Sequence, residues 1–477
     1  MTIGIQQLIG GVWRDGSGPT LESRNPANPE HVVASGLTAQ VADVDDAVAA
    51  ASTAAALWRR TPIHERALIL RRAATLLDQR AEQYGMELTI EEGKTLAEGI
   101  GEVRRAAEIF RFNADEANRQ AGDLFASPRL GERIMVVRKP LGVVGIITPW
   151  NFPVAIPAWK IAPALIHGNA VIWKPASLVP LLAYRLTQAL DEAGLPPGVI
   201  SLLIGPGPIG SRLAEHPGVR GLTFTGSTEV GTTLLQTCAA ARKPIQAEMG
   251  GKNAAVVLAD ADLDLAAQQV VIGAMRSTGQ KCTATSRVIV AEQVQTEFLQ
   301  RVSQLVSEIV IGDGTDARVT MGPAASLSAQ QEIQAAISSG LAAGAKILAQ
   351  AEPGGESDGF FVPATVMQLP DTSLDLWRDE VFGPVLAVTS ARDTAHAFEL
   401  ANDSVFGLSA GVFTSDLTNA LTAIDVLDVG VLHVNSETAG ADPHVPFGGS
   451  KESGYGPKEQ GRASREFFTQ TTTVYLR

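Results

Sequence analysis

Short apolar runs alternate with amphipathic, helix-like segments through the middle of this chain. The apolar runs are rich in Val and Ile, which predicts β-strands, and the segments between them repeat their apolar residues with helical spacing. Such alternation is typical of a parallel, doubly wound α/β sheet, whose ligands bind beyond the carboxyl ends of the strands. The predicted strands are residues 143–148, 170–173, 199–204, 221–225 and 254–258, and the predicted helices lie near residues 156–166, 181–193, 209–215 and 229–241.

The rest of the chain extends this pattern on both sides. Residues 43–118 have helical periodicity and predict a helical scaffold, and residues 263–434 alternate again, which predicts a second α/β section. A β-rich ribbon at residues 132–139 and a Thr- and aromatic-rich end at residues 467–476 predict strands that leave the domains. Strands of that kind can pair with the sheet edge of another subunit.

Composition narrows the class of protein. The chain has 477 residues, of which 45% are hydrophobic and 19% charged, as in an ordinary globular protein. A net charge of -13 disfavours nucleic-acid and anionic-membrane partners, which need basic surface. Two cysteines are too few for a disulfide scaffold, so we predict a cytoplasmic protein without structural zinc or another metal. The start of the chain does not resemble a signal peptide, and prolines interrupt the most apolar region, residues 143–173, so no membrane span is predicted.

Cys282 stands in a polar, turn-prone segment, residues 276–286, between two apolar flanks. A cysteine used for packing normally has aliphatic neighbours, so this setting suits a reactive thiol, although a lone cysteine is more often a small buried hydrophobe. The thiolate is the nucleophilic form, and a nearby cation raises its fraction. Lys281 and Arg276 are the candidates for that effect.

Polar side chains follow several of the predicted strands. Asn151 lies on a turn between two prolines, where its carboxamide can donate to a developing oxyanion, although the residue is also a common turn former. Lys174 and Ser177 follow the next strand, where they can meet a nucleotide ribose or phosphate. Glu248 and Glu380 each lie beside glycines and are candidates for a general base or, alternatively, for surface carboxylates.

Two glycine-containing segments are candidates for binding phosphate. Residues 205–210, GPGPIG, match the G-x-G-x-x-G pattern, but two prolines remove amides that would contact a pyrophosphate. Residues 224–231, FTGSTEVG, fit better, because a strand there meets a helix through small residues with free N–H groups. Neither has the ending of a P-loop, which disfavours hydrolysis of nucleoside triphosphates.

Seven motifs together resemble the aldehyde dehydrogenase superfamily, in the family's order and at its spacing. They are TPWNFP, KPAS, FTGSTEVG, EMGGKN, GQKC, EVFGPV and PFGGSKESG, and they span nearly the whole chain. The resemblance implies an aldehyde dehydrogenase-like α/β fold with two doubly wound α/β domains and a small β arm that joins a homodimer or homotetramer. By that resemblance, residues 1–120 and 140–249 form a dinucleotide-binding domain, residues 250–443 form a catalytic domain that carries the thiol, and residues 121–139 and 457–477 form the oligomerisation arm.

The same resemblance implies a covalent mechanism. Cys282 would attack the carbon of an aldehyde, and the Asn151 side chain with the Cys282 backbone N–H would hold the oxyanion. Hydride transfer to nicotinamide would leave a thioester, and Glu248 would activate the water that hydrolyses it. Family members that pass the acyl group to coenzyme A lack this glutamate, so the chain resembles the hydrolytic branch. A thiol esterase or hydrolase that uses Cys282 and Glu248 without redox turnover is the alternative of a different class.

The implied cofactor is NADP or NAD. Lys174 would bind the adenosine ribose, and a glutamate that repels a 2′-phosphate in strict NAD enzymes of the family is replaced here by Ser177. A hydroxyl that bonds a charged phosphate contributes about 1.5–3 kcal/mol, so we predict that NADP is accepted, with its preference over NAD left open. The predicted cofactor-binding residues are Thr148, Pro149, Trp150, Lys174, Ala176, Ser177, Gly207, Gly226, Ser227, Gly231, Glu380 and Phe382.

The substrate is predicted from fewer residues. Arg276 matches the position of an arginine that binds the distal carboxylate in semialdehyde dehydrogenases, although it can equally form a scaffold ion pair. The companion arginine of succinic semialdehyde enzymes is replaced by Trp159. The wording of three segments, AIPAWKIAPALIHGNAV, STGQKCTATSR and TAGADPHVPFGG, is similar to α-ketoglutaric semialdehyde dehydrogenases, and succinic semialdehyde and neutral or aromatic aldehydes are the alternatives. The predicted substrate-pocket residues are Phe152, Trp159, Arg276, Ser286, Arg287 and His444.

Overall fold

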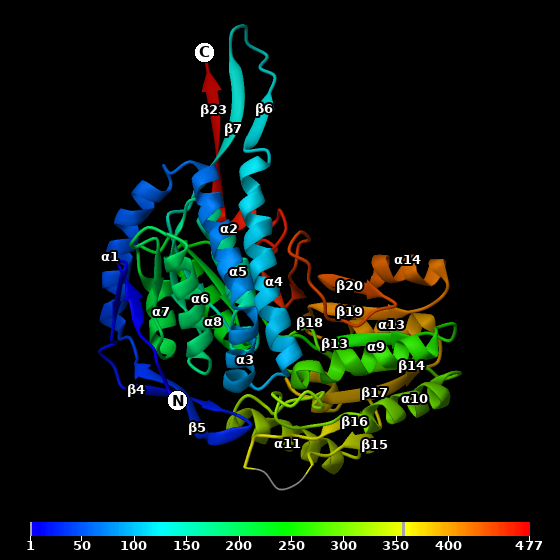
Figure 1. Ribbon diagram of the computed structural model, residues 1–477. Helices are drawn as coiled ribbons and strands as arrows, with labels where there is room; N and C mark the ends of the chain where they lie inside the picture. The colour runs from blue at the N-terminus through cyan, green and yellow to red at the C-terminus, as the bar shows by residue number, and fades with distance from the viewer. Residues whose placement is uncertain (1, 355–357) are drawn as a thin grey trace.

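The computed structural model describes residues 2–354 and 358–477, which form two large sheets and a projecting three-stranded arm (Figure 1). The predicted α/β class, with doubly wound sheets, is confirmed. No helix among the described residues is long and apolar enough to cross a membrane.

The first sheet has a parallel centre with antiparallel strands at its edges. Three of its parallel strands, Val143–Ile147, Ala170–Lys174 and Gly221–Thr225, follow the sequence-based prediction closely, and Ile200–Leu202 is shorter than the predicted 199–204. The parallel strand Ile245–Glu248 was not predicted, and the predicted strand 254–258 belongs instead to the second sheet, as Asn253–Val257. In spatial order the strands are β22 (Gly454–Tyr455), β12 (Ile245–Glu248), β11 (Gly221–Thr225), β8 (Val143–Ile147), β9 (Ala170–Lys174), β10 (Ile200–Leu202), β2 (Gln7–Ile9) and β3 (Val12–Arg14).

Helices cover both faces of this sheet, so its central strands are buried on both sides. Strand β8 shows the reason for its continuous apolar run. Its residues Val144 and Ile146 pack into one core, and Val143 and Ile147 pack into the other. The first core includes α2 (Ile63–Gln79), α4 (Leu96–Ala114), α5 (Ala155–Ile166) and α6 (Pro180–Glu192), and the second includes α1 (Val41–Trp58), α7 (Gly207–Glu215) and α8 (Thr228–Ala240).

The second sheet is parallel except for its edge strand β15. Its spatial order is β15 (Lys346–Ala351), β16 (Ala364–Gln368), β17 (Val385–Ala391), β14 (Thr285–Ala291), β13 (Asn253–Val257), β19 (Ser409–Phe413) and β20 (Val431–Val434). One face packs with α11 (Leu327–Ala342), α12 (Asp375–Arg378), α13 (Thr394–Asn402) and α14 (Leu417–Val426), and the other with α9 (Leu263–Met275) and α10 (Gln295–Ser307).

The arm projects from the body at the end of α4 (Figure 1). It consists of β6 (Gly122–Phe125), β7 (Arg133–Pro140) and β23 (Thr469–Leu476), and β7 and β23 pair antiparallel along their whole length. The predicted ribbon and the predicted C-terminal strand are therefore partners within one chain.

Smaller elements connect these parts. They are α3 (Ala81–Glu92), α15 (Ser464–Phe468), the 3-10 helices η1 (Asp115–Asn118) and η2 (Arg276–Gly279), and the short strands β1 (Ile3–Gly4), β4 (Thr20–Asn25), β5 (Asn28–Leu37), β18 (Phe406–Gly407) and β21 (Ser450–Lys451).

Candidate active site

The parallel strands of the first sheet end at one edge, where the predicted functional residues gather. In the register of the sheet, Ile147 pairs with Lys174 and Thr225 pairs with Glu248. The strand order reverses between β8 and β11, which is the usual ligand position in such sheets. A cleft of about 410 Å³ opens there. It is lined by Pro149, Trp150, Asn151, Ile156, Thr225, Gly226, Ser227, Met249, Gly250, Cys282, Ser326, Ser328, Ala329, Glu332, Glu380, Val381 and Phe382.

Cys282 enters this cleft from the turn between η2 and β14. Its backbone carbonyl accepts a hydrogen bond of 2.8 Å from Asn253 Nδ2. Burial raises the pKa of the Cys282 thiol to about 12, and the charges of Glu380 and Glu248 act in the same direction. The predicted activation by neighbouring cations is wrong, because the ammonium of Lys281 lies 3.5 Å from Glu437 and the thiol pKa is raised rather than lowered.

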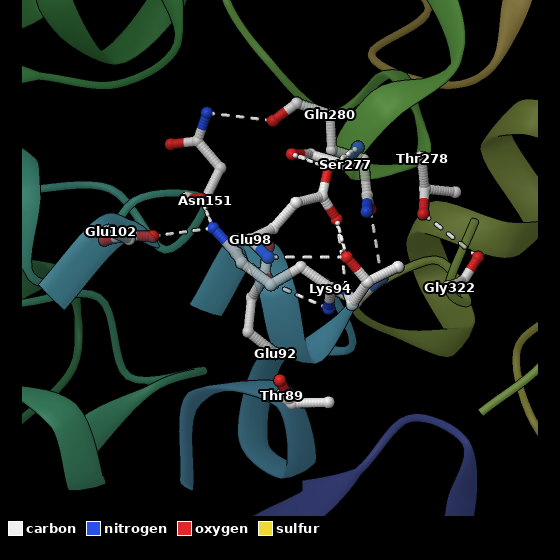
Figure 2. A network of polar contacts seen from close by, with 12 residues as sticks. Thr89, Glu92, Lys94, Glu98, Glu102, Asn151, Ser277, Thr278, Gln280 and Gly322 are labelled. Carbon is white, nitrogen blue, oxygen red and sulfur yellow. Dashed lines mark hydrogen bonds and ion pairs between the residues drawn. The ribbon is translucent and has the colours of Figure 1, made fainter. Parts of the chain in front are cut away.

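The loop before the thiol has an unusual backbone. Ser277 and Thr278 have φ angles of 53° and 55°, a region that costs about 1–2 kcal/mol per non-glycine residue. Hydrogen bonds from distant segments hold this geometry, as Figure 2 shows: Oε1 of Glu98 accepts from the Ser277 amide at 2.8 Å, and Thr278 Oγ1 donates to the Gly322 carbonyl at 3.0 Å. Glu98 was not predicted from the sequence, because its only local signal is its capping box with Thr95.

Asn151 lies beyond the end of β8, with its side chain directed to the thiol loop (Figure 2). Its Nδ2 donates a 2.9 Å hydrogen bond to the backbone carbonyl of Gln280, two residues before Cys282. Asn151 is 3% exposed and lines the same cleft as the thiol, so the second N–H of its carboxamide is available to a ligand there. The role of Gln280 as the anchor of this carboxamide was not foreseen.

Glu248 is the last residue of β12 and is 4% exposed. Its Oε2 accepts a 3.0 Å hydrogen bond from the Gly449 amide. Burial and the neighbouring charge of Glu459 hold the pKa of Glu248 well above its usual range. Glu459 is itself buried and paired with Lys160, so a chain of ionisable groups leads away from Glu248.

Six predicted cofactor-binding residues line the cleft: Pro149, Trp150, Gly226, Ser227, Glu380 and Phe382. Ser227 caps the N-terminus of α8, whose free amides favour an anionic group. Glu380 Oε1 accepts from the Gly251 amide at 2.9 Å, and burial raises the pKa of Glu380 to about 7. The rings of Trp150 and Phe382 meet edge to face, with their centres 5.5 Å apart. The donors, the carboxylate and the aromatic wall fit a dinucleotide.

Other predicted cofactor residues lie along the same sheet edge. Within the described parts of the chain, the ammonium of Lys174 has no hydrogen bond or ion pair, and burial lowers the pKa of Lys174. The Ser177 hydroxyl donates to the Gly205 carbonyl at 2.9 Å, which ties the two loops together. Ala176 is half-buried in the same loop, Gly207 is exposed at the start of α7, and Thr148 is buried, with its hydroxyl accepting from Trp173.

The prediction for Gly231 is corrected. It lies buried where α8 packs on the sheet, and a Cβ at this position would stand 2.4 Å from the sulfur of Met249. Gly231 therefore permits close helix–strand packing and does not face the cleft. Gly226 lines the cleft, but its amide donates a 3.2 Å hydrogen bond to the backbone carbonyl of Glu248.

The predicted substrate residues divide into several groups. The Trp159 ring lies 5.5 Å from the Phe447 ring, and its Nε1 is buried without a hydrogen-bond partner among the described residues. Phe152 is half-buried beside the oxyanion donor. Arg276 and His444 are exposed, and no described residue pairs with the guanidinium of Arg276.

Arg287 is not free to bind substrate, and its prediction is corrected. It is 2% exposed, and its guanidinium donates to the backbone carbonyls of four residues, three of which belong to the end of α13 or the turn after it. Its charge also lies over the Trp377 ring. Arg287 therefore fastens α13 to the second sheet. The hydroxyl of the neighbouring Ser286 donates to the Asn253 carbonyl at 3.4 Å and does not line the cleft.

No group of three His, Cys, Asp or Glu residues able to hold a metal occurs in the described ranges. Cys282, the carboxamide of Asn151 and the carboxylate of Glu380, whose pKa is raised, line the same cleft. That combination suits acyl chemistry on sulfur coupled to hydride transfer. Glu248 does not line the cleft and is bonded to the Gly449 amide.

Comparison with known proteins agrees with this geometry. The sequence profile of the Aldehyde dehydrogenase family matches residues 13–474. An α-ketoglutaric semialdehyde dehydrogenase of Bacillus subtilis (strain 168) is 41% identical over 98% of this chain and 97% of its own length.

Solved structures give the same result. An NADP-dependent enzyme of E. coli is similar with a TM-score of 0.96 at 32% identity, over 99% of this chain and 98% of that one. A betaine aldehyde dehydrogenase of Staphylococcus aureus in complex with NAD+ also gives a TM-score of 0.96, at 31% identity over 99% of this chain and 96% of that one.

Proposed function

Because the chain belongs to the aldehyde dehydrogenase family, and is thus an oxidoreductase that oxidises aldehydes with NAD(P), we propose that its substrate is α-ketoglutaric semialdehyde. The single observation that carries the reaction is the meeting of Cys282 and Asn151 in one cleft, through the hydrogen bond from the carboxamide to Gln280. The B. subtilis relative carries the choice of semialdehyde.

In the proposed first step the Cys282 thiolate attacks the aldehyde carbon. A C–S bond forms and the carbonyl electron pair moves to the oxygen, which the free N–H of Asn151 and the Cys282 amide stabilise. Collapse of this oxyanion expels a hydride, which a nicotinamide cofactor would accept when bound at the cleft. The product on the enzyme is a thioester of Cys282.

Glu248 carries the second step. As the ionised carboxylate it takes a proton from water while the water oxygen attacks the thioester carbon. The C–S bond then breaks, which releases the carboxylic acid and returns the thiolate of Cys282. The raised pKa of Glu248 makes it a stronger base than an exposed glutamate, and this suits the task.

The proposed cofactor site lies along the edge of the first sheet. The proposed domains are a dinucleotide-binding domain, a thiol domain and an arm. Lys174 offers an unpaired ammonium there, and Ser177 carries no charge that would repel a 2′-phosphate. These features support acceptance of NADP. The E. coli neighbour is NADP-dependent and the S. aureus neighbour holds NAD+, so the fold suits either cofactor.

Two observations support a substrate with a distal carboxylate or keto group. Arg276 is exposed six residues before the thiol and has no ion pair within the described ranges. Trp159 keeps a buried N–H without a partner, and buried donors are normally satisfied.

The proposal extends to assembly and location. Leu124, Phe125 and Leu130 on the arm are more than half exposed, and apolar strands of this kind favour pairing with a second copy in a homodimer or homotetramer. Both cysteines are free, which fits the reducing cytoplasm.

The test is the kcat/KM of the purified protein for α-ketoglutaric semialdehyde, succinic semialdehyde and benzaldehyde, each with NADP and with NAD, beside Arg276→Ala. We expect the α-ketoglutaric compound to be preferred and the preference to fall about tenfold or more in the variant, because a charge-assisted hydrogen bond contributes about 1.5–3 kcal/mol. Benzaldehyde, which has no distal carboxylate, is the internal control. A preference for benzaldehyde that Arg276→Ala does not change would reject the proposed substrate.

A further inference from the structure

Lys94 lies in a buried cluster beside the loop of Asn151 (Figure 2). Its Nζ is 2.7 Å from Glu102 Oε2 and 2.8 Å from the backbone oxygen of Asn151. The same Nζ lies 4.3 Å from the centre of the Phe152 ring. A charge this deeply buried needs partners that satisfy it. Lys94 and these partners therefore hold one another in place.

Glu102 extends this hold to the other end of the loop. Its second oxygen, Oε1, accepts from the Val154 amide at 2.8 Å and from the Ala155 amide at 3.1 Å, where α5 begins. The ion pair of Lys94 and Glu102 thus fixes both the carbonyl of Asn151 and the start of the following helix.

The carboxamide of Asn151 is fixed from the opposite direction. Its Nδ2 donates to the Gln280 carbonyl, so one N–H is used and one remains for the oxyanion. With the side chain held at its tip, a shift of the Asn151 backbone turns the remaining N–H away from its target. A misplacement of about 1 Å in such a constellation can cost about a hundredfold in rate.

The local sequence explains why Lys94 reaches this position. Gly93 ends α3 with a φ of 104°, and a Cβ there would stand 2.9 Å from Pro26 and from Pro323. Thr95 then caps α4 through its capping box. Lys94 is therefore held between the end of one helix and the start of the next.

We propose that Lys94 is a positioning residue, which through its ion pair with Glu102 holds the Asn151 backbone so that the carboxamide meets the oxyanion formed on attack by Cys282. The inference rests on the proposed function. Lys94 does not line the cleft, so its effect on the reaction passes through Asn151.

The test is a double-mutant cycle in the full-length enzyme with α-ketoglutaric semialdehyde and NADP. Lys94→Met keeps the apolar stem and removes the ammonium, and we expect kcat to fall about 10- to 100-fold. In an Asn151→Ala background the same change is expected to alter kcat less than about twofold, because the group it positions is gone. Binding of NADP, followed by tryptophan fluorescence, is expected to be unchanged.

Lys243→Met is the matched control. Lys243 is also buried, and its ammonium donates to backbone carbonyls at the end of α7, away from the cleft. This variant is expected to lose stability without losing kcat. Should Lys94→Met fail to fold, Glu102→Gln replaces it in the same cycle, because the amide retains an acceptor for the helix start.

The outcomes separate the two claims. A kcat loss that persists in the Asn151→Ala background, or no loss at all in Lys94→Met or Glu102→Gln, overturns the role of Lys94 and leaves the proposed function standing. If the wild-type enzyme shows no aldehyde-dependent reduction of NADP or NAD, both the proposed function and the role of Lys94 are overturned. A kcat loss that occurs only in the enzyme that retains Asn151 supports Lys94 as a positioning residue.

Discussion

Two loops meet at the cleft, and they are held in different ways. The oxyanion loop, residues 148–153, has no residue with positive φ, and Pro149 and Pro153 fix φ at two of its positions. The thiol loop, residues 276–282, contains two non-glycine residues in the left-handed region. The prolines restrict the backbone of the first loop, whereas the strained backbone of the second is held by contacts from other segments.

This difference shows where each loop is vulnerable. The oxyanion loop is anchored by a buried charge pair that acts on its backbone. The thiol loop is anchored by Glu98 and by the carbonyl of Gly322, which offset the strain of Ser277 and Thr278. Residues 94–102, which form the turn before α4 and its first part, contact both loops (Figure 2).

The largest effect is expected for Asn151→Ala, which removes the hydrogen-bond donor of the oxyanion loop. Loss of one oxyanion donor costs about 10²–10³ in kcat. Stopped-flow formation of NADPH in the first turnover measures it. Asn169→Ala is the control, because Asn169 is a buried asparagine with structural hydrogen bonds outside the cleft. An equal loss of kcat in both variants would contradict a direct role for Asn151.

The thiol loop carries an ionisable group, the Cys282 thiol, whereas the carboxamide of the oxyanion loop does not ionise. The reaction rate is therefore expected to depend on pH through the thiol. The raised pKa of Cys282, about 12, leaves the thiol protonated at pH 7, and the thiolate fraction grows as pH rises. The first-turnover rate is therefore expected to increase about tenfold per pH unit between about pH 7 and 10. Asn151→Ala should lower this profile without changing its slope. A flat profile in the wild type would show that the thiolate is already formed at pH 7.

A smaller effect is expected for Glu98→Ala, which releases the thiol loop. The variant loses a helix-capping box and two hydrogen bonds to Ser277. The free energy of unfolding is expected to fall by about 1–3 kcal/mol, and urea denaturation measures it. Glu82→Ala, which breaks an exposed pair with Arg104, should change it by less than about 1 kcal/mol. A Glu98 variant as stable as that control would show that the thiol loop keeps its backbone geometry without the contacts of Glu98.

The sequence predicted most of the fold because the relevant signals are local. Short apolar strands buried on both faces, with helical periodicity between them, are visible without knowledge of contacts. The residues after each strand, such as Asn151, Lys174 and Gly226, could also be placed at one edge, because parallel strands share it. Strand β11 begins and ends at the predicted residues and β8 ends one residue before the prediction, whereas β12, on the other side of β11, was not predicted.

The failures share a different cause. Arg287 and Gly231 stand in motifs near functional residues, but their side-chain surroundings depend on packing partners far along the chain. The same is true of Lys281, whose charge is directed to Glu437 and not to the thiol. Adjacency in sequence does not give direction in space.

The sequence by itself determined the family, the α/β class and the identities of thiol, carboxamide and carboxylate. Only the tertiary structure decided how reactive and how well positioned these groups are. The contact of Lys94 with Asn151 spans 57 residues, and that of Glu98 with Ser277 spans 179. Burial sets the pKa of Cys282 and Glu248, and burial arises only when such distant segments pack together.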